Sequence, residues 1–247
     1  MSRLAPSDQR PPSEDTEDIS HDPGAGPGPS DKLTEVAQLV KPKLRGWLHA
    51  GTAPLATAGG IVLVALAPDS AARGAAAVYL AASLLLFGTS AIYHRFSWGP
   101  RGDAILRRID HANIYVFIAG SYTPLAVLLL PPRSATTLLV IVWSSALVGL
   151  SFRLLWLSAP RWLYTALYIA MGWAALFWLP QFLTNGGVAV FTLIVVGGLL
   201  YTGGAVVYAR KRPDPWPRWF GYHEIFHACT ILAFAAHYVA ISLAMYR

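Results

Sequence analysis

Two long runs of uncharged, mostly apolar residues restrict what this chain can fold into more than any other feature. Residues 75–93 and 188–208 contain no Asp, Glu, Lys or Arg. A helix needs about 20 apolar residues to cross a hydrocarbon core that is ~30 Å thick. Because 55% of all residues are hydrophobic and only 13% are charged, the sequence predicts a polytopic membrane protein rather than a water-soluble domain.

The hydropathy pattern indicates seven spans separated by short loops. The predicted spans are residues 46–67, 75–97, 108–130, 134–154, 161–180, 187–209 and 220–245. Short loops make consecutive helices antiparallel neighbours. We therefore predict an all-α membrane protein that folds as a seven-transmembrane helix bundle.

Lys and Arg are distributed unevenly between the two sets of loops. Sixteen of the 19 lie in the N-terminal segment or in the loops after the second, fourth and sixth spans, and three lie on the opposite side. Loops rich in Lys and Arg stay on the cytoplasmic side. The count predicts a cytoplasmic N-terminus and an outside C-terminus, in a multi-pass protein of the cell (inner or plasma) membrane.

The first 41 residues differ in composition from the rest. They hold eight of the 13 acidic residues and a stretch of Pro, Gly and Ala at 23–29. Such a segment buries too little apolar surface to offset the entropy cost of ordering it. We predict a disordered, acidic and Pro/Gly-rich cytoplasmic tail at 1–41, followed by a membrane domain at 42–247.

Two histidines open the last predicted span. His223 and His227 are four residues apart, which on a helix places them about 40° apart around the axis and ~6 Å apart along it. Both imidazoles can therefore reach one cation. Because such a pair also occurs in ordinary helix packing, a metal site needs a third ligand.

The predicted topology brings further polar residues to the same depth. His94 ends the second span and Asp110 begins the third, on the side where the seventh span begins. Ionisable side chains are costly in a membrane and call for a partner or a function. Three histidines with an open fourth position are typical of a catalytic zinc site. Ser90, one turn before His94, either joins this site or only bonds to its own helix.

The remaining histidines of the membrane domain are not expected to bind the metal. His49 lies at the mouth of the first span, where a snorkelling role suffices. His111 points away from the site and is expected at the membrane interface, and His237 lies ~15 Å deeper as a hydrogen-bonded core residue. The single cysteine, Cys229, excludes a cysteine-based metal site.

The string from His223 to His227 also satisfies H-E-x-x-H, in which the glutamate of a zinc protease is the general base. An intramembrane protease would need Glu224, rather than Asp110, on the metal-bound water. The motif is short, chance matches are common, and here it opens a membrane helix. The protease stays open as an alternative.

Together these residues resemble a known family. The likeness covers about residues 43–247 and is carried by Ser90-x-x-x-His94, by Asp110 with the segment Ile118–Pro124, and by the residues from His223 to His227. In this pattern the chain resembles the hemolysin III family, bacterial members of the progestin and adipoQ receptor group, which in turn resembles the alkaline ceramidases.

The resemblance implies a seven-helix bundle with the N-terminus inside. It implies a zinc ion held by His94, His223 and His227. It also implies that Asp110 hydrogen-bonds the metal-bound water and that Ser90 sits beside it.

Two functions are compatible with this pattern. The first is a zinc-dependent, ceramidase-like hydrolase of a lipid amide or ester, with Asp110 and Ser90 as catalytic residues and membrane lipid as the partner. The alternative is a non-enzymatic receptor, membrane-homeostasis or cytolytic protein in which the metal is structural. No nucleic-acid partner is expected, because the net charge of +6 comes from Lys and Arg in the loops.

Overall fold

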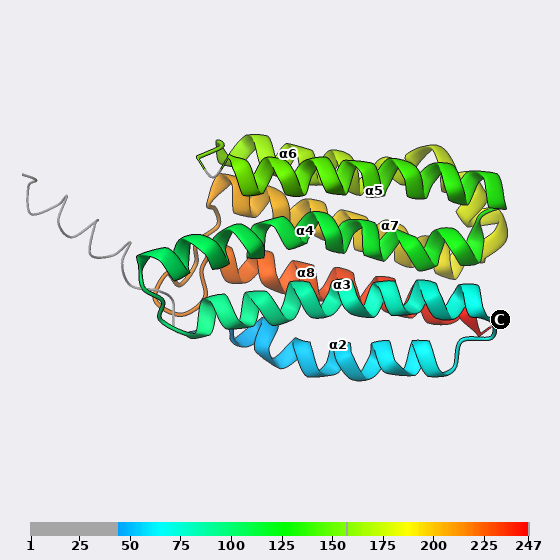
Figure 1. Ribbon diagram of the computed structural model, residues 1–247, viewed down its shortest axis with the longest axis horizontal. Helices are drawn as coiled ribbons and strands as arrows, with labels where there is room; N and C mark the ends of the chain where they lie inside the picture. The colour runs from blue at the N-terminus through cyan, green and yellow to red at the C-terminus, as the bar shows by residue number, and fades with distance from the viewer. Residues whose placement is uncertain (1–43, 157, 247) are drawn as a thin grey trace, which may run out of the picture. The chain divides into compact units, whose positions relative to one another are not determined.

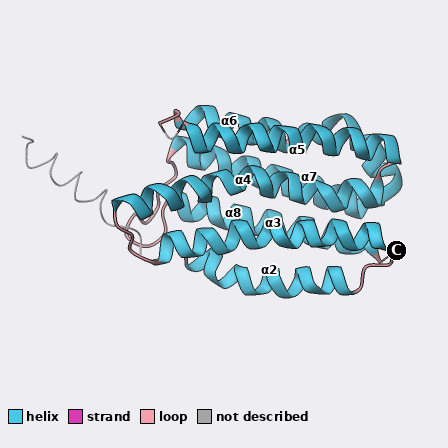
Figure 2. Cartoon of the chain, viewed as in Figure 1, coloured by secondary structure: helices cyan, strands magenta, loops and turns pink. Residues whose placement is uncertain are grey.

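Long helices account for most of the chain in this computed structural model, which describes residues 44–156 and 158–246 (Figure 1). Within these residues the only β pairing is an isolated bridge between Trp216 and Phe220, and the rest is helix, turn and loop (Figure 2). The predicted tail, residues 1–41, lies outside the described part. The elements are α2 (Trp47–Ala65), α3 (Ser70–Arg95), α4 (Pro100–Leu129), α5 (Pro132–Leu155), α6 (Arg161–Gly172), η1 (Ala174–Trp178), α7 (Leu179–Arg210) and α8 (Tyr222–Met245).

The outer surface of the bundle is apolar. Leu55, Val148 and Val188 are 71–74% exposed, and exposed apolar surface on this scale marks contact with lipid rather than water. Helices long and apolar enough to cross a membrane occur in six stretches of the described chain: Trp47–Ala65, Ser70–Arg95, Pro100–Leu129, Pro132–Leu155, Arg161–Arg210 and Tyr222–Met245. The prediction of an all-α, multi-pass membrane protein is confirmed.

Five predicted spans correspond one to one with these stretches, whereas the fifth and sixth, 161–180 and 187–209, fall together in the 50-residue stretch Arg161–Arg210. This stretch consists of α6, η1 and α7, and its backbone leaves helical geometry at Gly187, with φ 71° and ψ 174°. Glycine is essentially the only residue that adopts this conformation. Figure 1 shows α6 and α7 running in opposite directions, so the chain turns back within a stretch that is helical almost throughout.

The central element is α4. Of its most apolar window 72% is buried, against 28% for α2 and for α5. Small residues let its neighbours approach closely: a Cβ on Gly149 of α5 would lie 2.3 Å from the Tyr115 ring, and one on Gly120 would lie 2.4 Å from Cβ of Ala82 in α3. Packing through small residues is the usual way for helices to associate in lipid.

The start of α4 differs from the prediction. The helix begins at Pro100, rather than at residue 108, because hydropathy detects the apolar part of a helix and not its polar first turns. Proline is favoured at a first helical position. The two extra turns carry Arg101 and Arg107, and Arg107 lies near Tyr93 in the last turn of α3.

Candidate metal centre

Three histidines meet where α3 ends and α8 begins. His94 lies in the last turn of α3, and His223 and His227 lie in the first two turns of α8. One ring nitrogen from each lies within 4.8 Å of the other two, and all three side chains are buried. The residues predicted as ligands therefore lie together, and this triad could hold a metal ion.

The spacing of one pair of these nitrogens fits a tetrahedral ion. Nε2 of His94 and Nε2 of His223 are 3.2 Å apart. Two tetrahedral ligands at ~2.0–2.1 Å from zinc have their nitrogens about 3.3 Å apart. Imidazole nitrogens are also the donors that zinc and related transition metals prefer. Separations within the triad extend to 4.8 Å, so the third imidazole has to move closer to the other two for all three to bind such a cation.

Asp110 and Ser90 flank this triad. Oδ2 of Asp110 lies 3.7 Å from Nε2 of His94, and Ser90 lies beside Asp110 on the wall of the same cavity. Both residues are buried, with 8% and 2% of their surface exposed. Ser90 is therefore close enough to the candidate centre to join it, as the first of its two alternatives requires. The catalytic roles assigned to the two residues remain predictions.

Glu224 is committed to other contacts. Its Oε1 accepts a hydrogen bond from Nε of Arg45 at 2.9 Å, and its Oε2 accepts one from the backbone N–H of Gly221 at 2.8 Å. The first interaction is an ion pair with a carboxylate that is 1% exposed, and the second caps the N-terminus of α8. Because both oxygens are used in this way, the carboxylate is not placed as the general base that the protease alternative needs.

The start of α2 closes the centre from the side. Gly46 has φ 83°, and a Cβ on it would lie 2.8 Å from Cβ of His94, so glycine permits both the backbone turn and the close approach. One turn further on, the His49 ring stacks on His227 with centroids 3.8 Å apart and planes 10° from parallel. His49 is 2% exposed, so the snorkelling role expected from the sequence is wrong.

The other two histidines differ in how well they match expectation. His237 Nε2 lies 3.2 Å from the carbonyl oxygen of Ile194, as expected for a hydrogen-bonded core residue. The His111 ring contacts Nη2 of Arg153 at 2.7 Å and the Tyr208 hydroxyl at 3.3 Å, and its place at the membrane interface stays a prediction. The periodicity of α4 alone does not reveal that α5 and α7 contribute these partners.

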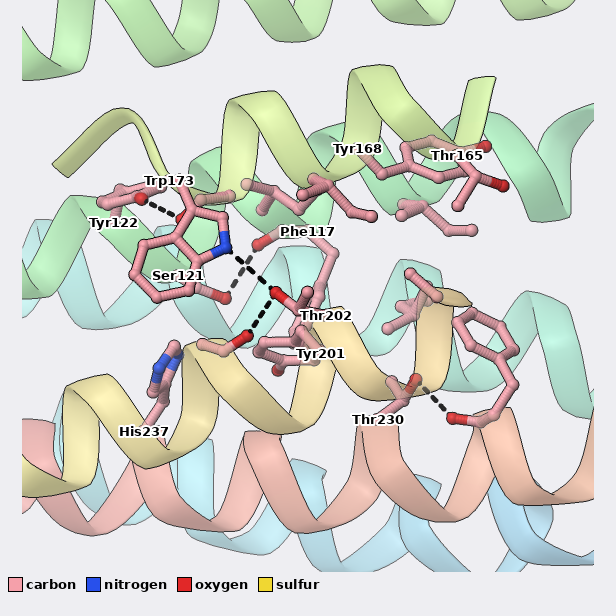
Figure 3. Close-up of a pocket in the computed structure, with 18 of the residues that line it drawn as sticks. Phe117, Ser121, Tyr122, Thr165, Tyr168, Trp173, Tyr201, Thr202, Thr230 and His237 are labelled. Carbon is pink, nitrogen blue, oxygen red and sulfur yellow. Dashed lines mark hydrogen bonds between the residues drawn. The ribbon is translucent and has the colours of Figure 1, made fainter. Parts of the chain in front are cut away.

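An apolar cavity of about 130 Å³ leads away from the centre between α4, α6, α7 and α8 (Figure 3). Polar groups along it bond to the wall: Ser121 donates to the carbonyl of Phe117 at 2.8 Å, and Trp173 donates to Thr202 at 3.0 Å. These bonds leave mainly hydrocarbon and ring surface facing the cavity.

A second, polar cavity of about 620 Å³ lies on the other side of the centre. His94 lines the polar cavity, His227 lines the apolar one, and His223 lines both. The candidate metal centre therefore sits at the junction of an apolar and a polar space. The cationic residues lining the polar cavity are Arg45, Arg107, Arg108, Arg153 and Arg161.

These features define a class: a multi-pass helical membrane protein with a buried histidine triad at one end of its bundle. The family model described as "Haemolysin-III related" matches residues 37–238. The chain belongs to this family, as its motifs predicted.

Named relatives agree with this assignment. The chain is 36% identical over 161 residues to the "Hemolysin-3 homolog" of Bacillus subtilis (strain 168), covering 64% of this chain and 71% of the relative. It is 26% identical over 187 residues to "Hemolysin-3" of Bacillus cereus, covering 74% and 85%. A more distant relative is the "Heptahelical transmembrane protein ADIPOR2" of rice (Oryza sativa subsp. japonica), 29% identical over 184 residues, with 67% of this chain and 80% of the relative covered.

Proposed function

We propose that this protein is a zinc-dependent hydrolase of a lipid amide or ester. The observation that carries the proposal is the position of the histidine triad and Asp110 at the junction of an apolar and a polar cavity. An amphiphilic substrate has the same division, with an amide or ester bond between its acyl chain and its headgroup. Its scissile bond would lie at the triad while its two ends occupy the two cavities.

Each residue has a definite task in this proposal. His94, His223 and His227 would hold the metal through their neutral imidazole nitrogens. A zinc ion held there supplies Lewis acidity, which polarises the substrate carbonyl and makes the attacking water more acidic. Asp110, with Ser90 beside it, takes the proton from the water and returns it to the leaving amine or alcohol.

The apolar cavity matches an acyl chain in character and length. It is lined from Asp110 to Leu125 of α4, which is a distance of about 22 Å by helical rise. That is more than half of a hydrocarbon core of ~30 Å. A single extended chain fits a space that is long, narrow and apolar better than a compact polar ligand does.

The topology that we propose has seven crossings, with the N-terminus in the cytoplasm. A straight helix of 50 residues would be about 75 Å long, more than twice the ~30 Å core, so Arg161–Arg210 is counted as two crossings joined near Gly187. The distribution of Lys and Arg supports this orientation, and the printed name of the rice relative, "heptahelical", agrees with the number. The polar cavity then opens toward the cytoplasmic headgroups.

The experiment combines metal analysis with hydrolysis of a panel of lipid amides and esters by the purified protein. His94→Ala and His227→Ala should each abolish zinc content and turnover together. Asp110→Asn should keep the zinc and lower turnover by at least ~100-fold, as loss of a general base does. Asp103→Asn is the matched control, because it makes the same change on α4 two turns away and should leave both values unchanged.

The same variants separate hydrolysis from a structural metal. If the ion only ties α3 to α8, the His94 and His227 variants lose zinc and stability, and neither the wild type nor Asp110→Asn cleaves any lipid in the panel. Wild-type protein that binds zinc stoichiometrically and is inert toward the panel would therefore favour the non-enzymatic alternative.

A further inference from the structure

The polar cavity beside the metal centre carries more positive charge than membrane topology requires. Five arginines line it, and no Asp or Glu is among its described lining residues. The carboxylates that contact lining residues are Glu224 on Arg45, Asp103 on Tyr93, Asp110 beside His94 and Asp214 on the backbone N–H of Tyr222. Five guanidinium groups against four carboxylates still leave an excess of positive charge, even before a metal cation is added.

The positive-inside rule accounts for arginines at this end of the bundle, but it predicts side chains that extend into water. Arg153 is only 3% exposed, and its guanidinium carbon lies 4.6 Å from the centre of the Tyr164 ring. Arg161 is half-buried, with its guanidinium carbon 4.8 Å from the centre of the Tyr208 ring. These two arginines are turned inward and braced on aromatic faces.

The five arginines come from four separate parts of the chain. Arg45 precedes α2, Arg107 and Arg108 belong to the early turns of α4, Arg153 ends α5 and Arg161 begins α6. Guanidinium groups that approach from several sides match a ligand with several acceptor oxygens. Arginine's planar fork binds phosphate through two parallel hydrogen bonds. A phosphate, with three or more free oxygens, can bond several such groups at once, whereas a carboxylate offers two oxygens.

We propose that this arginine-lined cavity binds a phosphate group, either on a lipid headgroup or as a free anion. The cavity volume of about 620 Å³ accommodates a phosphate together with the glycerol or amino-alcohol portion of a headgroup. Binding itself does not depend on hydrolysis at the metal centre. The extension that the substrate carries this phosphate does rest on the proposed function.

The test measures binding with a probe that cannot be hydrolysed. The purified full chain in neutral detergent is titrated with a dialkyl ether phosphatidic acid, which contains neither an ester nor an amide of a carboxylic acid, and with the matching dialkylglycerol, which lacks the phosphate. We expect the phosphate-bearing ether lipid to bind and the dialkylglycerol to bind at least ~10-fold more weakly. Because no turnover is measured, this result is independent of whether the protein is a hydrolase.

Variants locate the binding. Arg108→Gln and Arg161→Gln should each weaken binding of the ether phosphatidic acid by at least ~10-fold. Arg101→Gln removes the same charge from the exposed start of α4, outside the cavity lining, and should change binding by less than about twofold. Retained zinc content in all three variants serves as the check that each is folded.

Inorganic phosphate, titrated at constant ionic strength, identifies the source of the group. Binding of phosphate alone, lost in Arg161→Gln, supports a site for the free anion, and binding of the lipid without free phosphate supports a headgroup site. Equal binding of the ether phosphatidic acid and the dialkylglycerol overturns the proposal. So does an Arg101→Gln effect as large as that of Arg161→Gln, because the attraction would then be diffuse surface charge.

Discussion

A parallel stack of two imidazole rings supports the innermost residue of the histidine triad. The His49 ring covers one face of the His227 ring, with the two ring centroids 3.8 Å apart. His49 is itself packed edge-on against Phe87, with centroids 5.1 Å apart. Neither ring nitrogen of His49 has a hydrogen-bond partner among the described residues, and His49 is not one of the three residues that could share an ion. Its contribution is therefore the flat surface that fixes the plane of a neighbouring ligand.

This role predicts different outcomes for two substitutions of His49. His49→Phe keeps an aromatic ring against His227 and should leave the zinc affinity near the wild-type value. His49→Ala removes the ring and should weaken zinc binding roughly 10–100-fold, as loss of residues that orient a metal ligand does. Competition with a chromophoric chelator measures both. Equal loss in the two variants would mean that a His49 nitrogen, rather than its ring face, is what the site requires.

At this scale the sequence identified the triad but not the ring stack. Two histidines four residues apart must share a helix face, so His223 and His227 could be paired by counting alone. One sequence feature could have indicated that His49 is buried. It shares a helix face with the small residues Thr52, Ala56 and Gly60, which are also buried positions of α2. A single histidine at the end of a helix has no partner at i+4 that fixes its direction. Only the small residues on the same helix face indicate that its side chain points inward.

The element that determines the topology is the helical stretch from α6 to α7. Gly187 interrupts it with φ 71° and ψ 174°, and the sixth predicted span also began at this residue. Hydropathy could locate the interruption but could not show that it is a single glycine. The chain is helical up to Gly187, and the helix resumes directly after it. A short turn between two apolar segments leaves no polar loop for a sequence pattern to detect.

Substitution of Gly187 tests whether this backbone conformation matters for stability. Gly187→Ala should destabilise the folded protein by about 1–3 kcal/mol, because a Cβ strongly disfavours this region of φ and ψ. Gly203→Ala is the control: Gly203 is exposed, helical and has open space where its Cβ would be, so alanine should be neutral or stabilise by up to about 1 kcal/mol. Intrinsic fluorescence of the nine tryptophans follows thermal unfolding in detergent. Equal melting temperatures for the two variants would show that a Cβ at position 187 adds no backbone strain.

Across the whole molecule, sequence reasoning succeeded where connectivity alone decides the outcome. Antiparallel neighbours with short loops must bring the end of the second span and the start of the last one to the same membrane face, which is why His94 could be matched in depth with His223. The two cavities, in contrast, could not be predicted from connectivity. They depend on how far α4 extends beyond the apolar region and on where α5 and α6 end, so the convergence of Arg108, Arg153 and Arg161 was not predictable from spacing.

The number of crossings decides which compartment the polar cavity faces, and reporter fusions can measure it. With seven crossings from a cytoplasmic N-terminus, alkaline phosphatase fused after residue 186 or at the C-terminus is exported and active. Fused after residue 212, between α7 and α8, it stays inside and is inactive, and green fluorescent protein at the same points gives the reciprocal pattern. If Arg161–Arg210 crossed only once, the fusions at 212 and at the C-terminus would exchange their activities. The seven-crossing pattern would put His94, His223 and the arginine-lined cavity beneath the inner leaflet. This is the side on which 16 of the 19 Lys and Arg residues are predicted to lie. An amphiphilic ligand would then enter from the inner leaflet.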